Sequence, residues 1–345
     1  SRRWGHSGGM QLHYYLWQIQ AYFVARRLHQ KIGFDLTHHV TFMKYCNPCF
    51  LSLLPSPFIW GPVGGGESAP NTFWEDFSWK AKIYEITRNL IRKLGEIDPF
   101  VHLTTKKSTV VRATTKDTAE RLYKIGAKQV QILPGFGLPE EDMALLTQYE
   151  IPDETPVRFI SIGRLLHWKG FHLGLRAFAQ ANLPNTEYWI VGEGPECDRL
   201  QILARDLGID RKVKFWGKLP REKALDLLRD CHVLVHPSLH DSGGWVCMEA
   251  MAAGRPVLCL DLGGPAIQVT NETGFKIPAL EPYQAVRDLA ASMIHLVKDP
   301  ELRISMGFAG RKRVSQNYSW NAVGEDLNKL YTEVKRQKPG AKMTK

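Results

Sequence analysis

HPSLHDSGGWVCMEAMAAGRPVL, residues 236–258, is the stretch that decides the fold of this chain. It follows the apolar run 233–235, which is typical of a buried strand, and crosses a polar loop into the helix-favouring run 246–253. Gly254 ends that helix, and Pro256 opens the next strand. We therefore predict a strand-loop-helix-strand unit in which backbone N–H groups at the start of the helix face an anion.

Two carboxylates flank this loop. Asp241 precedes the glycine pair, and Glu249 lies in the helix with seven residues between them. If most of the spacing is helical, the two lie about 10 Å apart along the axis, which suits gripping two parts of one elongated ligand better than sharing a metal ion. Ionised carboxylates accept hydrogen bonds from vicinal hydroxyls, so the pattern predicts a nucleotide sugar as ligand. The alternative is a structural loop with a solvated aspartate and a glutamate on the helix surface.

A second motif, GRLLHWKG at residues 163–170, follows the predicted strand 157–162. The fork of Arg164 can bind a diphosphate, and Lys169 can add a point charge as the leaving group becomes negative. Basic residues after a strand are often only solvated. Here their position favours function, because ligands of open parallel sheets bind beyond the carboxyl ends of the strands.

The second half of the chain alternates cleanly between strands and helices. Near-continuous apolar strands separated by helices predict a parallel, doubly wound sheet. The predicted strands are 157–162, 187–191, 213–216, 233–236 and 256–260, with helices near 172–181, 196–207 and 221–229 and a helical tail at 282–297, 300–316 and 319–335.

The first half shows a weaker pattern of the same kind. The glycine run Gly64, Gly65 and Gly66 follows a strand, which indicates either close approach of the backbone to a phosphate or sugar or a flexible turn. The predicted helices are 11–31 and 116–123, and the predicted strands or strand ends are 34–40, 57–60, 101–103, 110–114 and 130–133.

Residues 73–94 combine apolar side chains at spacings of three or four with basic ones, which predicts an amphipathic basic helix. Such a helix either packs on the chain's own sheet or lies on an anionic membrane. The apolar positions are Trp79, Ile83, Ile86, Leu90 and Leu94, and the basic ones are Lys80, Lys82, Arg88, Arg92 and Lys93.

Composition narrows the class of protein. The 345 residues suffice for two domains, and 44% hydrophobic with 23% charged residues is typical of a soluble globular chain without an apolar run that spans a bilayer. The net charge of +10 divides evenly, since residues 1–150 hold 18 basic against 13 acidic residues and residues 151–345 hold 27 against 22. This spread favours anionic substrates and an anionic lipid surface over nucleic acid, for which no motif is present.

Six cysteines form no disulfide framework, and the lone Cys46-Asn-Pro-Cys49 does not predict zinc, so we expect a reducing cytoplasm.

Asp241-x7-Glu249 with the following Ala-Met-Ala-Ala-Gly-x-Pro-Val resembles the Glu-x7-Glu element of retaining glycosyltransferases of family 4, which have the GT-B fold. The 163–170 motif is similar to that family's Gly-Arg-Leu-x-x-x-Lys-Gly. Asp241 stands where the family usually has a glutamate, so its charge is set back by one methylene. The resemblance covers residues 157–335 strongly and 34–137 more weakly.

The resemblance implies an α/β chain of GT-B type, with two Rossmann-like doubly wound parallel-sheet domains facing across a cleft. Residues 1–137 would form the acceptor-side domain, with its first strands expected to be missing, and residues 138–156 a linker. Residues 157–318 would bind the nucleotide sugar, and the helix 319–336 would cross back to the first domain.

The implied activity is that of a hexosyltransferase in polysaccharide or glycolipid biosynthesis. It would move a hexose from a UDP- or GDP-sugar to a hydroxyl of a glycan or lipid-linked sugar, in the cytoplasm or peripherally at the inner face of the membrane. No cofactor is expected, and no metal either, since the chain lacks an Asp-x-Asp signature. Two alternatives remain open: a nucleotide-sugar binding module without turnover, and a GT-B sugar-nucleotide epimerase.

Each motif residue then receives an expected role. Arg164, Lys169 and the amides of Gly243 and Gly244 would stabilise the diphosphate, Asp241 would hold hexose hydroxyls and Glu249 the ribose. Many relatives place a histidine after the strand that here leads into glycines. His38 or His39, one strand earlier, would either substitute for it or have a structural role, as paired histidines at a strand end more often do. The remaining expected donor-binding residues are Gly163, Lys218, Leu219, Ser242, Trp245, Gly64, Gly65 and Gly66.

Overall fold

A computed structural model describes residues 7–41, 43–133, 136–152 and 155–336. Contacts between residues divide the chain into two compact units. Unit 1 takes its residues from Ser1–Gly66, Arg88–Gly135 and Glu325–Lys345, and unit 2 from Glu67–Thr87 and Phe136–Gly324. Two boundaries fall inside helices, in α2 (Trp79–Glu96) and α13 (Trp320–Arg336).

Unit 2 contains a six-stranded sheet in the order β10-β9-β8-β5-β6-β7, with every pair parallel. Chain order reverses between the neighbours β5 and β8, so the loops that follow them leave a crevice at the carboxyl edge of the sheet. The strands are β5 (Val157–Ile162), β6 (Thr186–Val191), β7 (Val213–Gly217), β8 (Val233–His236), β9 (Val257–Leu260) and β10 (Gly274–Ile277).

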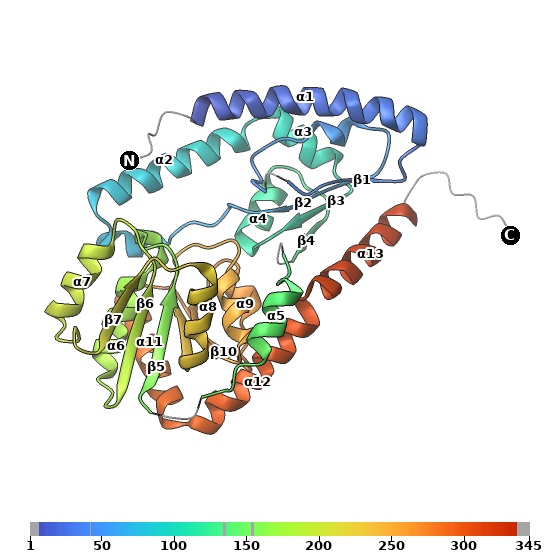
Figure 1. Ribbon diagram of the computed structural model, residues 1–345. Helices are drawn as coiled ribbons and strands as arrows, with labels where there is room; N and C mark the ends of the chain where they lie inside the picture. The colour runs from blue at the N-terminus through green and yellow to red at the C-terminus, as the bar shows by residue number, and fades with distance from the viewer. Residues whose placement is uncertain (1–6, 42, 134–135, 153–154, 337–345) are drawn as a thin grey trace. The chain divides into compact units, whose positions relative to one another are not determined.

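Helices cover both faces of this sheet, and the strands alternate their side chains between two apolar cores. In β8, Val233 and Val235 join the core under α6 and α11, whereas Leu234 joins the core under α8 and α9 (Figure 1). The helices are α5 (Glu140–Thr147), α6 (Phe171–Ala181), α7 (Cys197–Asp206), α8 (Arg221–Asp230), α9 (Trp245–Ala252), α10 (Pro265–Gln268), α11 (Pro282–Lys298) and α12 (Pro300–Asn317), with the 3₁₀ turns η2 (Asn71–Asp76) and η3 (His167–Lys169).

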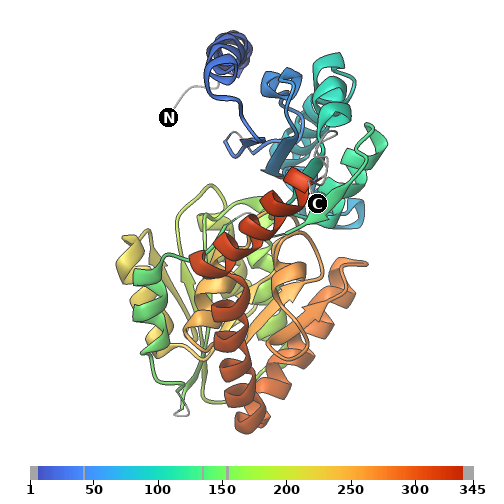
Figure 2. The same ribbon diagram turned by 90° about the vertical axis from the view of Figure 1, so that its right-hand side faces the viewer.

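Unit 1 contains a four-stranded parallel sheet in the order β1-β2-β3-β4. Leu330 and Val334 of α13 pack with Ile59 and Val110 on one face of it, and α12 leads directly into α13 (Figure 2). The elements are α1 (Ser7–Ile32), β1 (Thr37–His39), the 3₁₀ turn η1 (Phe50–Leu53), β2 (Phe58–Val63), α3 (Pro99–Lys107), β3 (Val110–Ala113), α4 (Lys116–Lys124) and β4 (Val130–Ile132).

The structure corrects the secondary structure expected at three places. Residues 101–103, expected as a strand end, lie in α3, which begins with Pro99 after the N-cap Asp98; the Asp98 side chain accepts from the Phe100 N–H. Residues 138–156, expected as a linker, include helix α5, whose Leu146 is buried in the unit 2 core. Strand β10 was not expected, because its alternating Gly-Phe-Lys-Ile is short.

The predicted helix within 73–94 is present as α2, but its apolar face is not packed on a sheet. Trp79, Ile83, Ile86, Leu90 and Leu94 are each more than half exposed. The buried α2 side chains are instead Ala81, Glu85 and Arg92. The alternative in which the apolar face packs on the chain's own sheet is therefore wrong.

Candidate functional site

The two loops at the reversal of strand order in unit 2 pack directly against each other. The Leu239 N–H donates to the Trp168 carbonyl over 2.7 Å. Gly170 has a φ of +67°, and a Cβ there would lie 1.9 Å from the Pro237 carbonyl oxygen, so only glycine allows this approach. The motif after β5 and the motif after β8 thus form one structural feature.

Asp241 lies at the centre of this feature and accepts four hydrogen bonds. Its Oδ2 accepts from Lys169 Nζ at 2.5 Å and pairs with His236 Nε2 at 3.1 Å. Its Oδ1 accepts from the N–H groups of Gly243 at 3.0 Å and Gly244 at 3.1 Å. These four partners fill the lone-pair sites of the carboxylate.

The charges around Asp241 keep it ionised. Burial raises the pKa of Asp241, but the hydrogen bond from His236 and the positive charge of Lys169 outweigh burial and hold this pKa well below its usual range. Burial lowers the pKa of His236, so at neutral pH its ring is uncharged and donates from Nε2. The cluster therefore carries one ammonium and one carboxylate.

This arrangement differs from the one expected for the glycine amides. An aspartate readily accepts from the N–H groups two and three residues later, and Asp241 does so with Gly243 and Gly244. In this structure the two N–H groups therefore donate within their own loop, and their binding of a diphosphate stays a prediction. The first turn of α9, beginning at Trp245, follows them and has its own N–H groups without intrahelical partners.

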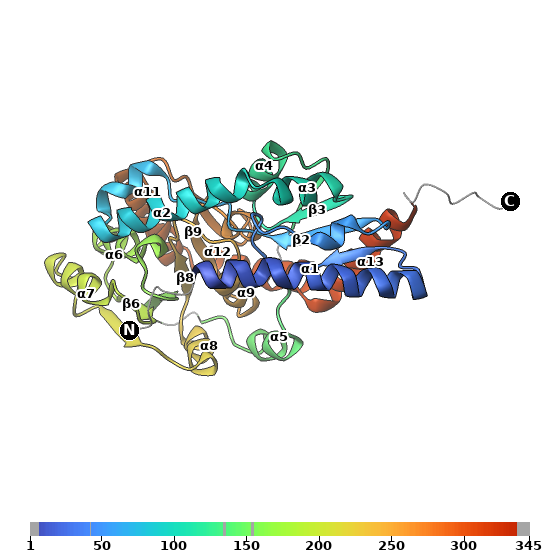
Figure 3. The same cartoon turned by 90° about the horizontal axis from the view of Figure 1, so that it is seen from above.

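Glu249 is the second carboxylate of the motif and lies on α9. Its Oε1 accepts from Arg221 Nη2 at 2.5 Å, and Arg221 also pairs with Asp142 at 2.9 Å, which joins the neighbouring helices α8 and α5 (Figure 3). Burial raises the pKa of Glu249 to about 7, against the opposing effect of Arg221. Glu249 therefore changes its charge near neutral pH.

Two adjoining hollows open beside these residues, and Gly163 and Arg164 line both. The first has a volume of about 640 Å³. Its lining includes Phe136, Gly163, Arg164, Trp168, Lys169, Arg221, His236, Asp241, Gly243, Gly244, Trp245 and Glu249.

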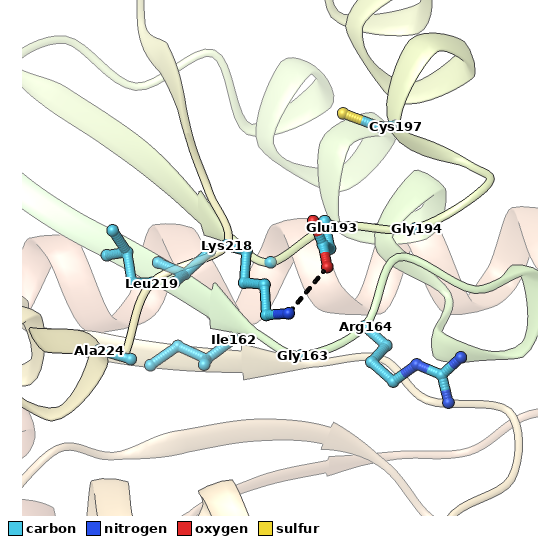
Figure 4. A pocket seen from close by; sticks show the side chains of 11 residues that line it. Ile162, Gly163, Arg164, Glu193, Gly194, Cys197, Lys218, Leu219 and Ala224 are labelled. Carbon is cyan, nitrogen blue, oxygen red and sulfur yellow. Dashed lines mark ion pairs between the residues drawn. The ribbon is translucent and has the colours of Figure 1, made fainter. Parts of the chain in front are cut away.

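The second hollow has a volume of about 680 Å³ and lies at the ends of β5, β6 and β7. In Figure 4 the Lys218 side chain points toward Glu193, with which it forms an ion pair of 3.3 Å, whereas Arg164 points away from this pair. Leu219 and Ile162 add apolar surface on the same side as Lys218. This hollow thus offers an apolar wall with one polar pair.

The structure brings most of the predicted residues together, but not all of them. Ser242 lies in the same loop and donates to Glu67 at 2.6 Å instead of lining either hollow. Gly64–Gly66 belong to unit 1, where the Gly66 N–H donates to Thr118 Oγ1 at 3.1 Å and a Cβ at Gly66 would lie 2.6 Å from Thr118 Cα. This packing explains the glycine at 66, and a role of this run in donor binding stays a prediction.

The two histidines considered as substitutes have structural partners in unit 1. His38 pairs through Nε2 with the Gly61 carbonyl at 2.7 Å and through Nδ1 with the Tyr331 hydroxyl at 2.8 Å. His39 is buried and pairs with Thr41 at 3.3 Å. Both are therefore held by the fold of unit 1 in this structure.

Sequence reasoning missed three residues that line the first hollow. Arg221 contacts Glu249, His236 contacts Asp241, and Trp168 lies beside Lys169 in the loop. A usable signal was present for two of them, because His236 ends a strand and Arg221 opens a helix just after another strand end, both at the carboxyl edge of the sheet.

Metal ligands, membrane-spanning helices and reactive thiols would each indicate another kind of site. Within residues 7–41, 43–133, 136–152 and 155–336, no cluster of three or more histidine, cysteine or acidic side chains has the geometry of a metal site. Over the same ranges, no helix has the length and apolar character needed to cross a bilayer. Cys46 and Cys49 are free thiols, and burial raises the pKa of both, to about 12 for Cys49.

Comparison with known proteins finds a family similarity over the second half of the chain. Residues 147–313 match the family model described as "Glycosyl transferases group 1". This region is therefore similar in sequence to glycosyltransferases, and its parallel sheet belongs to a GT-B fold. The matched region contains both loops and, apart from Phe136, every residue that lines the two hollows. It also contains all residues of the Asp241 and Glu249 clusters except Asp142.

Individual relatives cover different shares of the chain. The D-inositol 3-phosphate glycosyltransferase of Corynebacterium jeikeium is 34% identical over 183 residues, which are 50% of this chain and 42% of the relative. The lipopolysaccharide core biosynthesis glycosyltransferase LpsE of Rhizobium meliloti is 26% identical over 270 residues, 76% of this chain and 75% of the relative. The chain spans about half the length of the corynebacterial and mycobacterial relatives it matches.

Solved structures show the fold of nearly the whole chain. Sucrose-phosphate synthase of Thermosynechococcus elongatus superposes with a TM-score of 0.60 at 21% identity, over 92% of this chain and 78% of that one. Anabaena HepE, solved with UDP and glucose, superposes with a TM-score of 0.59 at 18% identity, over 92% and 81%. The predicted fold class, α/β of GT-B type with two parallel sheets, is confirmed.

Proposed function

We propose that this protein is a retaining hexosyltransferase of family 4 that transfers a hexose from a nucleotide diphosphate sugar to an acceptor hydroxyl. The observation that carries the proposal is the first hollow, where Arg164, Lys169 and Glu249 converge at the reversal of strand order. Two cations suit a diphosphate, and a carboxylate beyond them suits the hydroxyls of a ribose. The activity of the whole protein, its substrates and its partners belong to this proposal.

Lys169 has the central role in the proposed reaction. In the structure its ammonium pairs with Asp241 at 2.5 Å. A bound diphosphate offers Lys169 a stronger anion, and as Lys169 turns to it, one lone pair of Asp241 Oδ2 becomes available to a hexose hydroxyl. The proposed contact of Asp241 with the hexose therefore depends on release of Lys169.

The rest of the donor would extend along the edge of the sheet. Glu249 would accept from the ribose hydroxyls, and the base would lie in the second hollow near Lys218 and Leu219. Arg164, which lines both hollows, would bind the diphosphate between them.

The proposed chemistry requires no protein nucleophile. As the glycosidic bond breaks, Arg164 and Lys169 stabilise the negative charge that develops on the departing diphosphate. A phosphate oxygen of the donor takes the proton of the acceptor hydroxyl on the same face, which retains the anomeric configuration. The chain has no Asp-x-Asp signature, so we expect transfer to proceed without a divalent metal and to persist in the presence of a chelator.

The relatives support the substrate class. HepE was solved with UDP-glucose, and a 31% identical relative from Corynebacterium glutamicum is named a GDP-mannose-dependent monoacylated phosphatidylinositol monomannoside mannosyltransferase. We propose a UDP- or GDP-hexose as donor and a glycan or lipid-linked sugar as acceptor.

A donor screen tests the proposal. Saturating donor at about 100 times its Kd stabilises the folded protein by about 2.7 kcal/mol, so the correct UDP- or GDP-sugar should raise the melting temperature by several degrees, and the others should not. With an acceptor present, free nucleotide should be released in step with the glycosylated product. Nucleotide-sugar isomerisation without acceptor would instead indicate an epimerase, and tight donor binding without any transfer a binding module.

We further propose that α2 places the protein on an anionic membrane, at its cytoplasmic face. Trp79, Ile83 and Ile86 expose their apolar side chains, and Lys80 lies over the Trp79 ring at 5.6 Å. Apolar side chains bordered by ammonium groups suit the boundary between acyl chains and anionic headgroups.

Vesicle binding measures this second proposal. The double variant Ile83→Ser with Ile86→Ser should lower the affinity for vesicles in which about a third of the lipid is an anionic phospholipid by about 100-fold. Each of the two apolar side chains contributes about 1.5 kcal/mol when it is buried in the interface. The matched control replaces two exposed apolar residues elsewhere, Ile202→Ser with Leu280→Ser, and should bind like the wild type. Equal binding by both double variants would contradict the proposal.

A further inference from the structure

The segment 67–87 belongs to unit 2 although it precedes that unit's other residues by nearly fifty positions. Its Glu85, on α2, is fully buried. Glu85 Oε1 lies 3.0 Å from His167 Nε2 and 3.1 Å from His240 Nε2. One carboxylate oxygen therefore contacts one histidine from each of the two site loops.

These histidines stand next to the charged residues of the site. His167 precedes Lys169 by two positions, and His240 directly precedes Asp241. Both imidazoles are buried, with 8% and 7% of their surface exposed. A shift of either histidine would therefore move Lys169 or Asp241.

An aromatic stack reinforces the same connection. The Trp168 ring lies parallel to Tyr84 of α2 at 5.0 Å and to His240 at 5.1 Å, with interplanar angles of 9° and 15°. Trp168 also lines the first hollow. The segment thus contacts the loops through the Glu85 carboxylate and the Tyr84 ring.

A buried carboxylate is stable only when its oxygens accept hydrogen bonds. Two imidazoles protonated on Nε2 donate to Glu85 at the same time, which holds the two histidines close to one point. Lys169 and Asp241, which pair at 2.5 Å, join the same two loops on the side of the hollow. The loops are therefore tied at two places, one of which lies outside the substrate-binding hollow.

We propose that Glu85 is a positioning residue of the site: through His167 and His240 it sets the separation of the loops that carry Lys169 and Asp241. This inference rests on the proposed function for its catalytic consequence. Glu67, from the same segment, adds a contact with Ser242 at 2.6 Å in the second loop. Glu85 touches both loops and neither hollow, so it acts on the reaction only through its partners.

The variant Glu85→Gln tests the proposal, because glutamine keeps the shape but replaces the charged oxygen that both histidines contact with a neutral, weaker acceptor. We expect kcat/KM for transfer to fall about 10- to 100-fold, with the larger part in kcat, since small displacements of charged groups cost most in the transition state. Donor affinity, measured by calorimetry, should weaken less.

Asp76→Asn is the matched control. Asp76 lies in the same segment, and its side chain also contacts a buried histidine, His172 at 3.6 Å, together with Arg176 at 2.7 Å. Both of these partners lie on α6 and not in the site loops. This variant should lower the melting temperature while kcat and donor Kd stay within about twofold of wild type, the change expected of a purely structural contact.

A spectroscopic readout keeps this test separate from the proposed function. His236 pairs with Asp241, so its Cε1–H signal reports displacement of Asp241. Glu85→Gln should move the His236 signal as well as those of His167 and His240, and Asp76→Asn should leave all three in place. If Glu85→Gln does not fold, His240→Gln replaces it, with kcat and the signals of His236 and His167 as readouts.

The outcomes separate the two proposals. An unmoved His236 signal in Glu85→Gln overturns the positioning role. If the wild type transfers sugar, a Glu85→Gln variant with the same kcat as the wild type overturns it too. If the wild type binds and transfers no sugar, the proposed function fails, and the His236 signal alone then decides whether Glu85 positions Asp241.

Discussion

Lys169→Ala is expected to lower the rate of sugar transfer by about 10²- to 10³-fold while the protein remains folded. Lys169 lines the first hollow and pairs with Asp241 at 2.5 Å, from which it would turn to the diphosphate. Once there, its ammonium stabilises the negative charge of the departing diphosphate, and alanine removes that positive charge entirely. Asp241 keeps three of its four hydrogen bonds in the variant, which is why the loop should survive.

The matched control is Lys214→Ala, which removes a lysine of the same sheet whose ammonium lies 3.5 Å over the Trp216 ring and not in the first hollow. Initial rates at saturating donor and acceptor, together with melting temperatures, decide the outcome. The Lys214 variant should transfer sugar at close to the wild-type rate. A Lys169→Ala enzyme within threefold of wild type, roughly the spread of a surface substitution, would remove Lys169 from the mechanism.

The second half of the fold could be predicted from sequence because its signals are local. Runs such as 157–162 and 233–236 are mostly apolar, the first leads into Gly163 and the second ends at His236, and the structure places β5 and β8 at those residues. Strands buried on both faces are near-continuous apolar runs, and ligand-binding motifs follow their carboxyl ends.

The first half was less predictable because its deciding interactions are distant in sequence. Residues 101–103 have a strand-like composition, but Asp98 and Pro99 start a helix that includes them. The apolar periodicity of α2 predicts its helix correctly but not its environment, since Glu85 and not the apolar face is buried. The reason, two histidines more than eighty and one hundred and fifty positions away, cannot be read from a local pattern.

In the site, too, the sequence predicts which residues take part but not which contacts they make. Sequence motifs identify Arg164, Lys169, Asp241 and Glu249, and the structure gathers all four at one hollow. The motifs do not reveal that Asp241 takes the glycine N–H groups for itself or that Arg221 pairs with Glu249. These contacts depend on side-chain geometry, which spacing along the chain does not specify.

Glu249 gives the second large effect, and its sign with pH follows from burial. Burial raises the pKa of Glu249 to about 7, so the carboxyl is protonated below pH 7 and ionised above it. Only the ionised form accepts from two ribose hydroxyls at once. Donor affinity should therefore rise about tenfold between pH 6 and pH 8, as the ionised fraction grows, and Glu249→Gln should remove this dependence. Glu249→Ala should abolish turnover with the fold intact.

Arg221 supplies an internal check on this assignment. Its guanidinium, 2.5 Å from Glu249 Oε1, opposes the effect of burial, so Arg221→Ala should move the midpoint of the affinity profile to higher pH.

The stability of the folded protein should also depend on the ionisation of Glu249, but it should fall as pH rises whereas donor affinity increases. Between the unfolded pKa of about 4.5 and the folded pKa of about 7, the folded state holds a proton that the unfolded state has lost, so the contribution of Glu249 to stability falls as pH rises through this window. Calorimetric donor titrations measure the trend in affinity, and melting curves measure the trend in stability, each at steps of about one pH unit from about pH 5 to about pH 8. A wild-type donor Kd independent of pH would show that Glu249 does not bind the ribose in its ionised form.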